Sequence, residues 1–142
     1  MLSIQEISDR FELQDLTNRY CHLLDQGLFD ELTQVFTDDA HIDYTSMGGI
    51  KGTPRQIVSF LKQVMPRFSN YQHMISNQQF ETSGDKATGA VAILSMVTRL
   101  VTNLGRPHPL TYSSVGLNVI SNRGVFNFPN VERYLHVVPR GY

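Results

Sequence analysis

The sequence predicts an α+β domain with helices in its first half and an antiparallel sheet in its second half. Up to Pro66, apolar residues recur at three- and four-residue spacing, which is the period of amphipathic helices. After Pro66 the period changes to two, as in strands with one buried face. Tight turns between successive strands favour antiparallel pairing. We therefore expect three helices to cover one concave face of a bent sheet, leaving a cone with a pocket inside.

The first helix has a clear beginning and end in the sequence. Ser3 and Glu6 fit a capping box, although Ser8 or Asp9 could cap a slightly later start. Gly27 supplies a stop signal. Between them runs an apolar stripe formed by Leu13, Leu16, Tyr20, Leu23 and Leu24.

Two further helices and a short strand follow before the main sheet. Residues 28–36 predict a short second helix, and residues 38–44 a short strand, with a glycine-rich loop after it. On that strand, alternation separates His41 and Asp43 from Ile42 and Tyr44. A third helix begins at Thr53, the expected N-cap before a proline, and continues through residue 65.

Four strands are expected after the helices, near residues 71–83, 86–104, 110–121 and 124–138. The segments SGDK and SNRG are tight-turn candidates that join the first and the last pair. Gly89 and Gly116 lie inside long strands, where they would permit a strong bend or a bulge.

The composition is that of one globular domain covering residues 1–142, with 41% hydrophobic and 18% charged residues. A net charge of −1 argues against a phosphate-binding surface, so we expect no nucleic-acid partner. No apolar run is long enough to span a bilayer, and the N-terminus lacks a signal-peptide pattern. The single cysteine, Cys21, suits a reducing compartment, and we expect a cytoplasmic protein. No spacing of ligand side chains indicates a metal site.

Asp25 is the least expected residue of the first helix. A carboxylate in the last turn lies at the negative end of the helix dipole, which disfavours it by roughly 0.3–1 kcal/mol. It lies one residue beyond the apolar stripe, so the pattern leaves open whether its side chain points inward. A solvated side chain or a bond to the loop at Gly27 would be the simplest explanation.

His73 is the candidate partner of Asp25. Alternation places Tyr71, His73, Ile75 and Asn77 on one face of the first long strand, and one of its two faces must line the concave side. A histidine there could act as a general base if an acceptor holds its second ring nitrogen. A structural histidine is the more common situation, so the residues alone support the pairing only weakly.

Four segments in order carry a resemblance to a known family: DRFELQDLTNRYCHLLDQG, LTQVFTDDAHIDY, GGIKG and YQHMISNQQFETSGDKATG. Over residues 9 to 98 this set resembles the SnoaL-like branch of the NTF2-like superfamily, which includes dehydratases, a dehydrochlorinase and polyketide cyclases. The resemblance implies a cone-shaped fold with a deep apolar pocket, no cofactor, and a homodimer or homotrimer.

The dehydratase-like members imply a site at Asp25, His73 and Tyr20. In that comparison His73 removes a proton, Asp25 orients and charges the imidazole, and Tyr20 donates to an oxyanion or a leaving hydroxyl. Tyr44 and Asn77 are further candidates for binding the substrate, although a cross-strand hydrogen bond is an equally simple role for them. The implied function is a cofactor-independent dehydratase acting on a small apolar cyclic molecule such as a polyketide, steroid or terpenoid.

Two alternatives stay open from the sequence. The same base could serve an isomerase or cyclase, and the fold also serves as a non-catalytic binding module. The dehydrochlorinase reaction is less favoured, because Arg99, Arg123 and Arg133 are only loose matches to its basic pocket residue. The C-terminal segment departs most from the family, since its turn reads NRGVF and the chain has no tryptophan.

Overall fold

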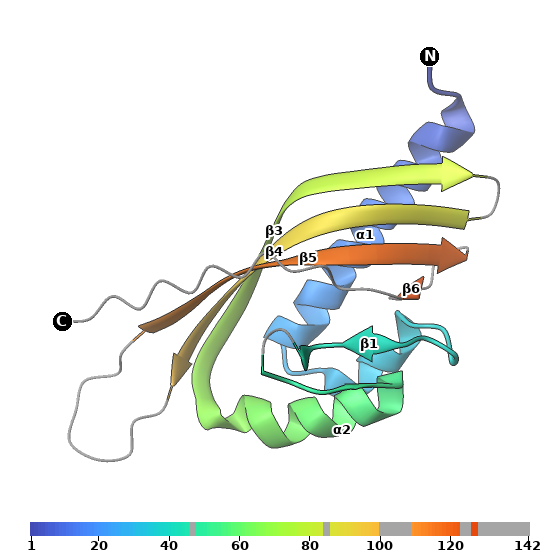
Figure 1. Ribbon diagram of the computed structural model, residues 1–142. Coiled ribbons are helices and arrows are strands. Elements are labelled where there is room, and N and C mark those ends of the chain that lie inside the picture. Colours follow the sequence, from blue (N-terminus) through green and yellow to red (C-terminus); the bar gives the residue numbers. More distant parts are fainter. Residues whose placement is uncertain (46–47, 84–85, 100–108, 123–125, 128–142) are drawn as a thin grey trace.

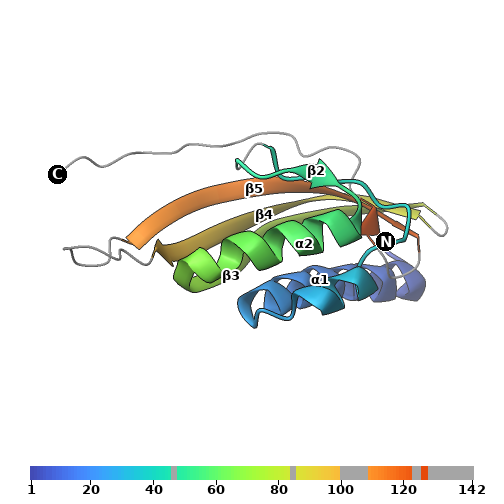
Figure 2. The same ribbon diagram turned by 90° about the horizontal axis from the view of Figure 1, so that it is seen from below.

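The computed structural model describes residues 1–45, 48–83, 86–99, 109–122 and 126–127. Helix α1 lies across one face of an antiparallel sheet, and α2 leads directly into its first long strand (Figures 1 and 2). The elements in order are α1 (Ile4–Asp25), η1 (Phe29–Gln34), β1 (Ile42–Asp43), β2 (Lys51–Gly52), α2 (Pro54–Val64), η3 (Met65–Arg67), β3 (Phe68–Ser83), β4 (Lys86–Arg99), β5 (Pro109–Asn122) and β6 (Phe126–Asn127).

The two ends of α1 are fixed by local hydrogen bonds. At the start, the Ser3 hydroxyl accepts the Glu6 N–H at 3.1 Å, and the Glu6 carboxylate accepts the Ser3 N–H at 2.7 Å. The earlier of the two predicted starts is therefore confirmed. At the end, Gly27 adopts a φ of 70° and donates to the carbonyl of Leu24, while the next amide donates to the carbonyl of Leu23. This is a Schellman motif, which leaves Asp25 without a local capping role.

The region between α1 and β3 differs from the prediction in four details. The predicted second helix is a six-residue 3₁₀ helix, η1, and α2 ends at Val64 before a further 3₁₀ turn. The predicted strand over residues 38–44 is limited to β1, and it pairs with β2, a two-residue strand inside the expected loop. Strands this short carry no alternation to detect, which is why β2 was missed.

The main sheet has the order β3-β4-β5-β6 with every neighbouring pair antiparallel. The three long strands bend along their length (Figure 1). Register shifts occur between Phe68 and Asn70 and between Ser76 and Gln79 on β3, and between Ile93 and Ser95 on β4, whereas Gly89 and Gly116 are both paired in register. The bulges therefore do not lie at either of the two glycines that were expected to permit a bend or a bulge. The predicted extensions over 100–104 and 128–138 lie outside the described residues.

The core lies between the helices and the sheet. Leu32, Val35, Ile57 and Val91, from three separate parts of the chain, are almost completely inaccessible to solvent. Phe68, Tyr71 and Ile75 are partly buried and pack against this cluster from β3. The α+β class is thus confirmed, while the enclosure of a cone-shaped pocket stays a prediction.

Gly89→Ala is expected to destabilise the domain by about 1–3 kcal/mol, the usual cost of overpacking. An added Cβ would lie 2.4 Å from the Phe80 ring and 2.6 Å from the Gln79 carbonyl oxygen, so strand β3 would have to shift. Chemical denaturation would measure the change, with Ala90→Ser at the exposed next position as the control. Equal unfolding free energies for the two variants would contradict this close contact between Gly89 and β3.

Candidate active site

Asp25 and His73 are in contact where the C-terminal end of α1 meets β3. The Asp25 Oδ1 lies 2.7 Å from the His73 Nδ1, and both carboxylate oxygens lie 3.0 Å from the His73 backbone nitrogen. The Asp25 side chain is 24% exposed and the His73 side chain 11%. The Asp25 carboxylate, which is unfavourable at the end of its own helix, is therefore stabilised by the backbone N–H and the Nδ1 of His73, a residue 48 positions later in the chain.

This contact determines which ring nitrogen of His73 is free. An ionised carboxylate only accepts hydrogen bonds, so the Nδ1 atom must donate and carries the ring proton. In the neutral imidazole, Nε2 is then an unprotonated acceptor. If Nε2 takes a proton, the resulting imidazolium lies directly beside a negative charge. The arrangement can hold a general base in one tautomer and stabilise its charged form.

The neighbours of His73 on the inner face of β3 are mostly apolar. Tyr71 and Ile75 flank it at alternate positions, and both pack against the core. The Tyr71 hydroxyl approaches Gly27, where an added Cβ would lie 3.2 Å from it. Tyr71 was not among the predicted site residues, although its alternation with His73 could have indicated it. Aromatic and aliphatic groups beside the histidine suit an apolar ligand.

Tyr20 and Tyr44 form a second polar pair, buried inside the protein. Their hydroxyl groups are hydrogen bonded to each other, and both side chains are at most 6% exposed. The Tyr20 ring also makes an edge contact with Phe36, at a centroid distance of 5.8 Å. In this bond one hydroxyl donates its proton and the other hydroxyl accepts it.

Burial keeps both phenols protonated at neutral pH. It raises the pKa of Tyr44 to about 12 and the pKa of Tyr20 well above its ordinary value, with the neighbouring tyrosine adding to the effect at Tyr20. Burial also raises the pKa of the Cys21 thiol to about 12, with Asp25 contributing by charge repulsion. The tyrosines can therefore act as neutral donors, and Cys21 is an unreactive core residue.

The expected position of Asn77 on the His73 face is wrong. Asn77 is exposed and has a φ of 51° within the bulge between Ser76 and Gln79. Asparagine tolerates this left-handed conformation better than most residues, which explains its place there. The extra residue reverses the alternation, so Gln78 points inward and Gln79 outward. Asn77 is accordingly omitted from the site described below.

Gln78 makes a contact that alternation did not predict. Its amide nitrogen donates to the Thr17 hydroxyl at 2.6 Å, and that hydroxyl donates to the Gln14 carbonyl at 2.8 Å. Thr17 is 1% exposed. Gln78 and His73 thus connect β3 to α1 at two points, two helical turns apart on the helix, and the two connections together fix how α1 lies on the strand.

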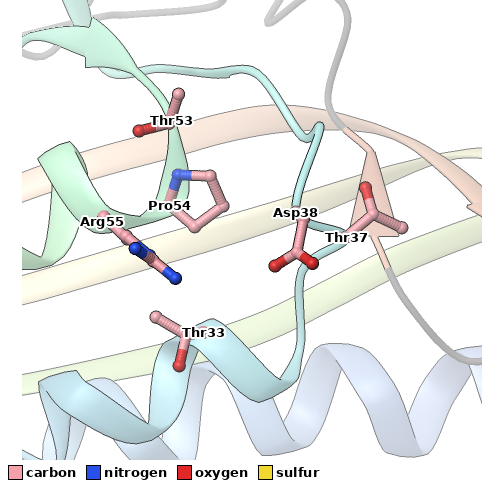
Figure 3. Close-up of a pocket in the computed structure, with 6 residues that line it drawn as sticks. All are labelled: Thr33, Thr37, Asp38, Thr53, Pro54 and Arg55. Atoms are coloured by element: carbon pink, nitrogen blue, oxygen red, sulfur yellow. The ribbon is translucent and has the colours of Figure 1, made fainter.

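A separate cleft of about 370 Å³ lies between η1 and the start of α2. Figure 3 shows Arg55 and Asp38 facing it from opposite sides, and Thr33, Thr37 and Thr53 also line it. None of the predicted site residues lines this cleft. Its mixed charges distinguish it from the apolar pocket that the sequence led us to expect around His73.

Several other predictions concern residues or sites that can be checked only within the described residues. The side chains of Arg99, Arg123 and Arg133 and the NRGVF turn lie outside the described residues. In the described ranges, no group of three His, Cys, Asp or Glu side chains could hold a metal ion. Nor does any helix within those ranges have the length and apolarity needed to cross a membrane.

The family is decided by a direct match between this chain and a family model. The model for the SnoaL-like domain matches residues 5–116. The chain belongs to the SnoaL-like family. Both Asp25 and His73 fall within the matched part of this SnoaL-like domain, as do Tyr20 and Tyr44.

Sequence relatives exist in mycobacteria. The chain is 46% identical over 91 residues to the uncharacterized protein Rv2910c of Mycobacterium tuberculosis and to Mb2934c of Mycobacterium bovis. The match covers 64% of this chain and 62% of the length of each relative. These relatives support the family but carry no activity to compare.

Solved structures show the same NTF2-like fold at low sequence identity. Kfla4162 from Kribbella flavida has a TM-score of 0.72 at 19% identity, covering 92% of both chains. A scytalone dehydratase-like protein from Novosphingobium aromaticivorans has a TM-score of 0.69 at 16% identity, covering 92% of this chain and 86% of the other. The hexachlorocyclohexane dehydrochlorinase LinA-type3 from Novosphingobium barchaimii has a TM-score of 0.69 at 19% identity, covering 96% of this chain and 94% of the other.

Proposed function

We propose that this SnoaL-like domain is a cofactor-independent dehydratase that acts on a small apolar cyclic molecule. The observation that carries the proposal is the 2.7 Å contact between the Asp25 carboxylate and His73 Nδ1, which leaves Nε2 as the base. Two proteins of the same fold are named for eliminations, one after scytalone dehydratase and the other as a hexachlorocyclohexane dehydrochlorinase, which favours a lyase over other reactions. The suitable substrate is a β-hydroxy carbonyl compound, because its α-proton is acidified by the carbonyl.

The reaction proceeds by removal of a proton and loss of water. His73 Nε2 takes the proton from the carbon beside the carbonyl, and the electrons of that C–H bond form an enolate. Collapse of the enolate forms the C=C bond and breaks the C–O bond to the hydroxyl. The imidazolium returns its proton to the leaving oxygen, so the products are an unsaturated carbonyl compound and water.

Tyr20 is assigned to the enolate oxygen. Its neutral hydroxyl, supported by Tyr44, donates a hydrogen bond to the negative charge that develops there. The apolar flanks of His73, Tyr71 and Ile75, exclude water from this charge and so strengthen the interaction. Asp25 stabilises the imidazolium during the same step.

Tyr20→Phe is expected to lower kcat by about 10²–10³-fold, the usual effect of removing one donor to an oxyanion. Tyr44→Phe is the matched control, because it removes the same tyrosine–tyrosine hydrogen bond. Both variants should lose a similar amount of stability, about 1–3 kcal/mol, because each removes the hydrogen bond between these two buried hydroxyls. Equal losses of kcat in the two variants would contradict the specific role of Tyr20.

The function itself is tested with a panel of cyclic β-hydroxy ketones. Dehydration produces a conjugated enone, which is followed by its ultraviolet absorbance. We expect turnover of at least one bicyclic member by the wild-type protein and none by His73→Ala. Tight binding of the panel without any turnover would favour the second candidate, a non-catalytic binding module. That candidate draws support from a neighbour in Catenulispora acidiphila solved in complex with S-DNPA, at a TM-score of 0.67 and 18% identity.

A further inference from the structure

The cleft between η1 and the start of α2 carries two opposite charges on facing walls. Its volume of about 370 Å³ lies within the usual range for sites that bind small molecules. Arg55 faces it from α2, and Asp38 faces it from the segment after η1 (Figure 3). This cleft is here called the threonine cleft, and its lining residues are Thr33, Thr37, Asp38, Thr53, Pro54 and Arg55.

The two charges face each other without forming a contact. Neither the Arg55 guanidinium nor the Asp38 carboxylate has an ion pair or a hydrogen bond with another described residue. The same two elements do form an ion pair elsewhere, because Lys62 of α2 lies 2.6 Å from Asp30 of η1. The cleft therefore holds Arg55 and Asp38 apart, and both charges are available to a molecule that enters it.

Local structure fixes each charge at its wall. Asp38 lies in a turn that is closed by the Ala40 N–H, which donates to the Thr37 carbonyl at 3.0 Å. Arg55 is the second residue of α2, where the positive end of the helix dipole disfavours a cation. A bound anion beside Arg55 would offset this unfavourable interaction.

This arrangement of charges selects the class of ligand. A purely anionic ligand would be repelled by Asp38, and a purely cationic one by Arg55. A neutral ligand would remove water from both charges without replacing it. A zwitterion satisfies both walls, because its carboxylate accepts from the guanidinium while its ammonium donates to the Asp38 carboxylate. We propose that the threonine cleft binds a small zwitterion with one ammonium and one carboxylate group, of the size of a free amino acid.

The threonines supply further partners for such a ligand. The Thr33 hydroxyl donates to the Asp30 carbonyl at 2.8 Å, so its oxygen is left to accept from the ammonium. Among the described residues, the Thr37 hydroxyl is the one buried side-chain polar group without a hydrogen-bond partner. Such groups are rare in folded proteins and call for a partner. Rotation about the Thr37 Cα–Cβ bond moves the hydroxyl to the place of the methyl group, so a ligand in the cleft can supply that partner.

Binding of a series of amino acids to the full chain tests the proposal. The probes are glycine, β-alanine, γ-aminobutyrate, δ-aminovalerate and ε-aminocaproate, which differ only in the number of carbons between their two charges. Isothermal titration calorimetry should show the tightest binding at one chain length, with a Kd of about 1 mM or below. Butyrate and butylamine carry only one of the two charges and should bind at least about tenfold more weakly.

Variants of the two walls show where the zwitterion binds. Arg55→Gln and Asp38→Asn should each raise the Kd of the tightest probe at least about tenfold, because each removes one ionic partner. Asp39→Asn, at the exposed next position outside the cleft, is the matched control and should leave the Kd within a factor of about two. His73→Ala should also keep the wild-type Kd, because the candidate active site does not line the cleft.

Exchange of the two charges tests the zwitterion itself. Arg55→Asp alone and Asp38→Arg alone should abolish detectable binding, whereas the double variant should regain it, because a zwitterion can bind in the reverse direction. Circular dichroism would verify that all variants are folded. No binding of any probe up to about 10 mM, butyrate or butylamine binding as tightly as the zwitterions, wall variants with the wild-type Kd, or a double variant that does not bind would overturn the proposal.

Discussion

His73→Ala is expected to reduce kcat by about 10²–10⁴-fold, the usual contribution of a positioned general base. The reason is that Nε2 is the atom assigned to proton removal, and alanine supplies no substitute. The substrate affinity should change much less, because the flanking Tyr71 and Ile75 remain in place. Steady-state kinetics on a substrate identified from the hydroxy ketone panel would separate kcat from KM.

The control for this variant is Met74→Ala on the same strand. Met74 is 44% exposed and points to the opposite face of β3, so its removal should leave kcat within a factor of about two. Thermal unfolding of both variants would show that the sheet is intact. An unchanged kcat in a folded His73→Ala protein would remove the proposed mechanism.

Asp25→Asn should also lower kcat by about 10²–10⁴-fold, for a different reason. The amide of asparagine can donate to Nδ1, which then loses its proton to Nε2 and exposes the wrong tautomer to the substrate. The imidazolium also loses its neighbouring charge. Asp15→Asn, an exposed position on the same helix, is the matched control and should have no effect.

Asp25 has a structural role as well, because it connects α1 to the backbone of β3. Its replacement should cost about 1.5–3 kcal/mol of folding stability, as for hydrogen bonds to a charged group. The pH dependence of kcat/KM distinguishes the catalytic role from the structural one. A purely structural loss would lower kcat/KM by the same factor at every pH. A profile with the wild-type shape, at a reduced height, would indicate that Asp25 acts only as a structural connection.

Much of this site follows from local rules of sequence. The Ser3 cap and the Gly27 stop fix the limits of α1, and those limits make Asp25 conspicuous as a charge at the unfavourable end. Strand alternation then groups His73 with Tyr71 and Ile75 on one face of the strand, while the structure decides that this face is the inner one. Both steps use only the nearest neighbours in the chain, which is why they succeed without knowledge of the fold.

The errors at the site have one physical source, the local irregularity of strand β3. Alternation assumes a regular strand, and the bulge at Asn77 inserts one residue that exchanges the two faces beyond it. Asn77 was therefore assigned to the wrong side, and the contact of Gln78 with Thr17 was missed. An asparagine within the strand is a weak sign of a left-handed residue, and only the register of β4 identifies it.

The central claim is that His73, held by Asp25, removes a proton from carbon. Deuterium exchange at the α-carbon of a cyclic ketone tests it most directly, because a ketone without a leaving group isolates the proton transfer from loss of water. In heavy water, NMR should show exchange catalysed by the wild-type protein and about 10²-fold slower exchange with His73→Ala and Asp25→Asn. Equal exchange rates for the wild type and both variants would contradict the claim.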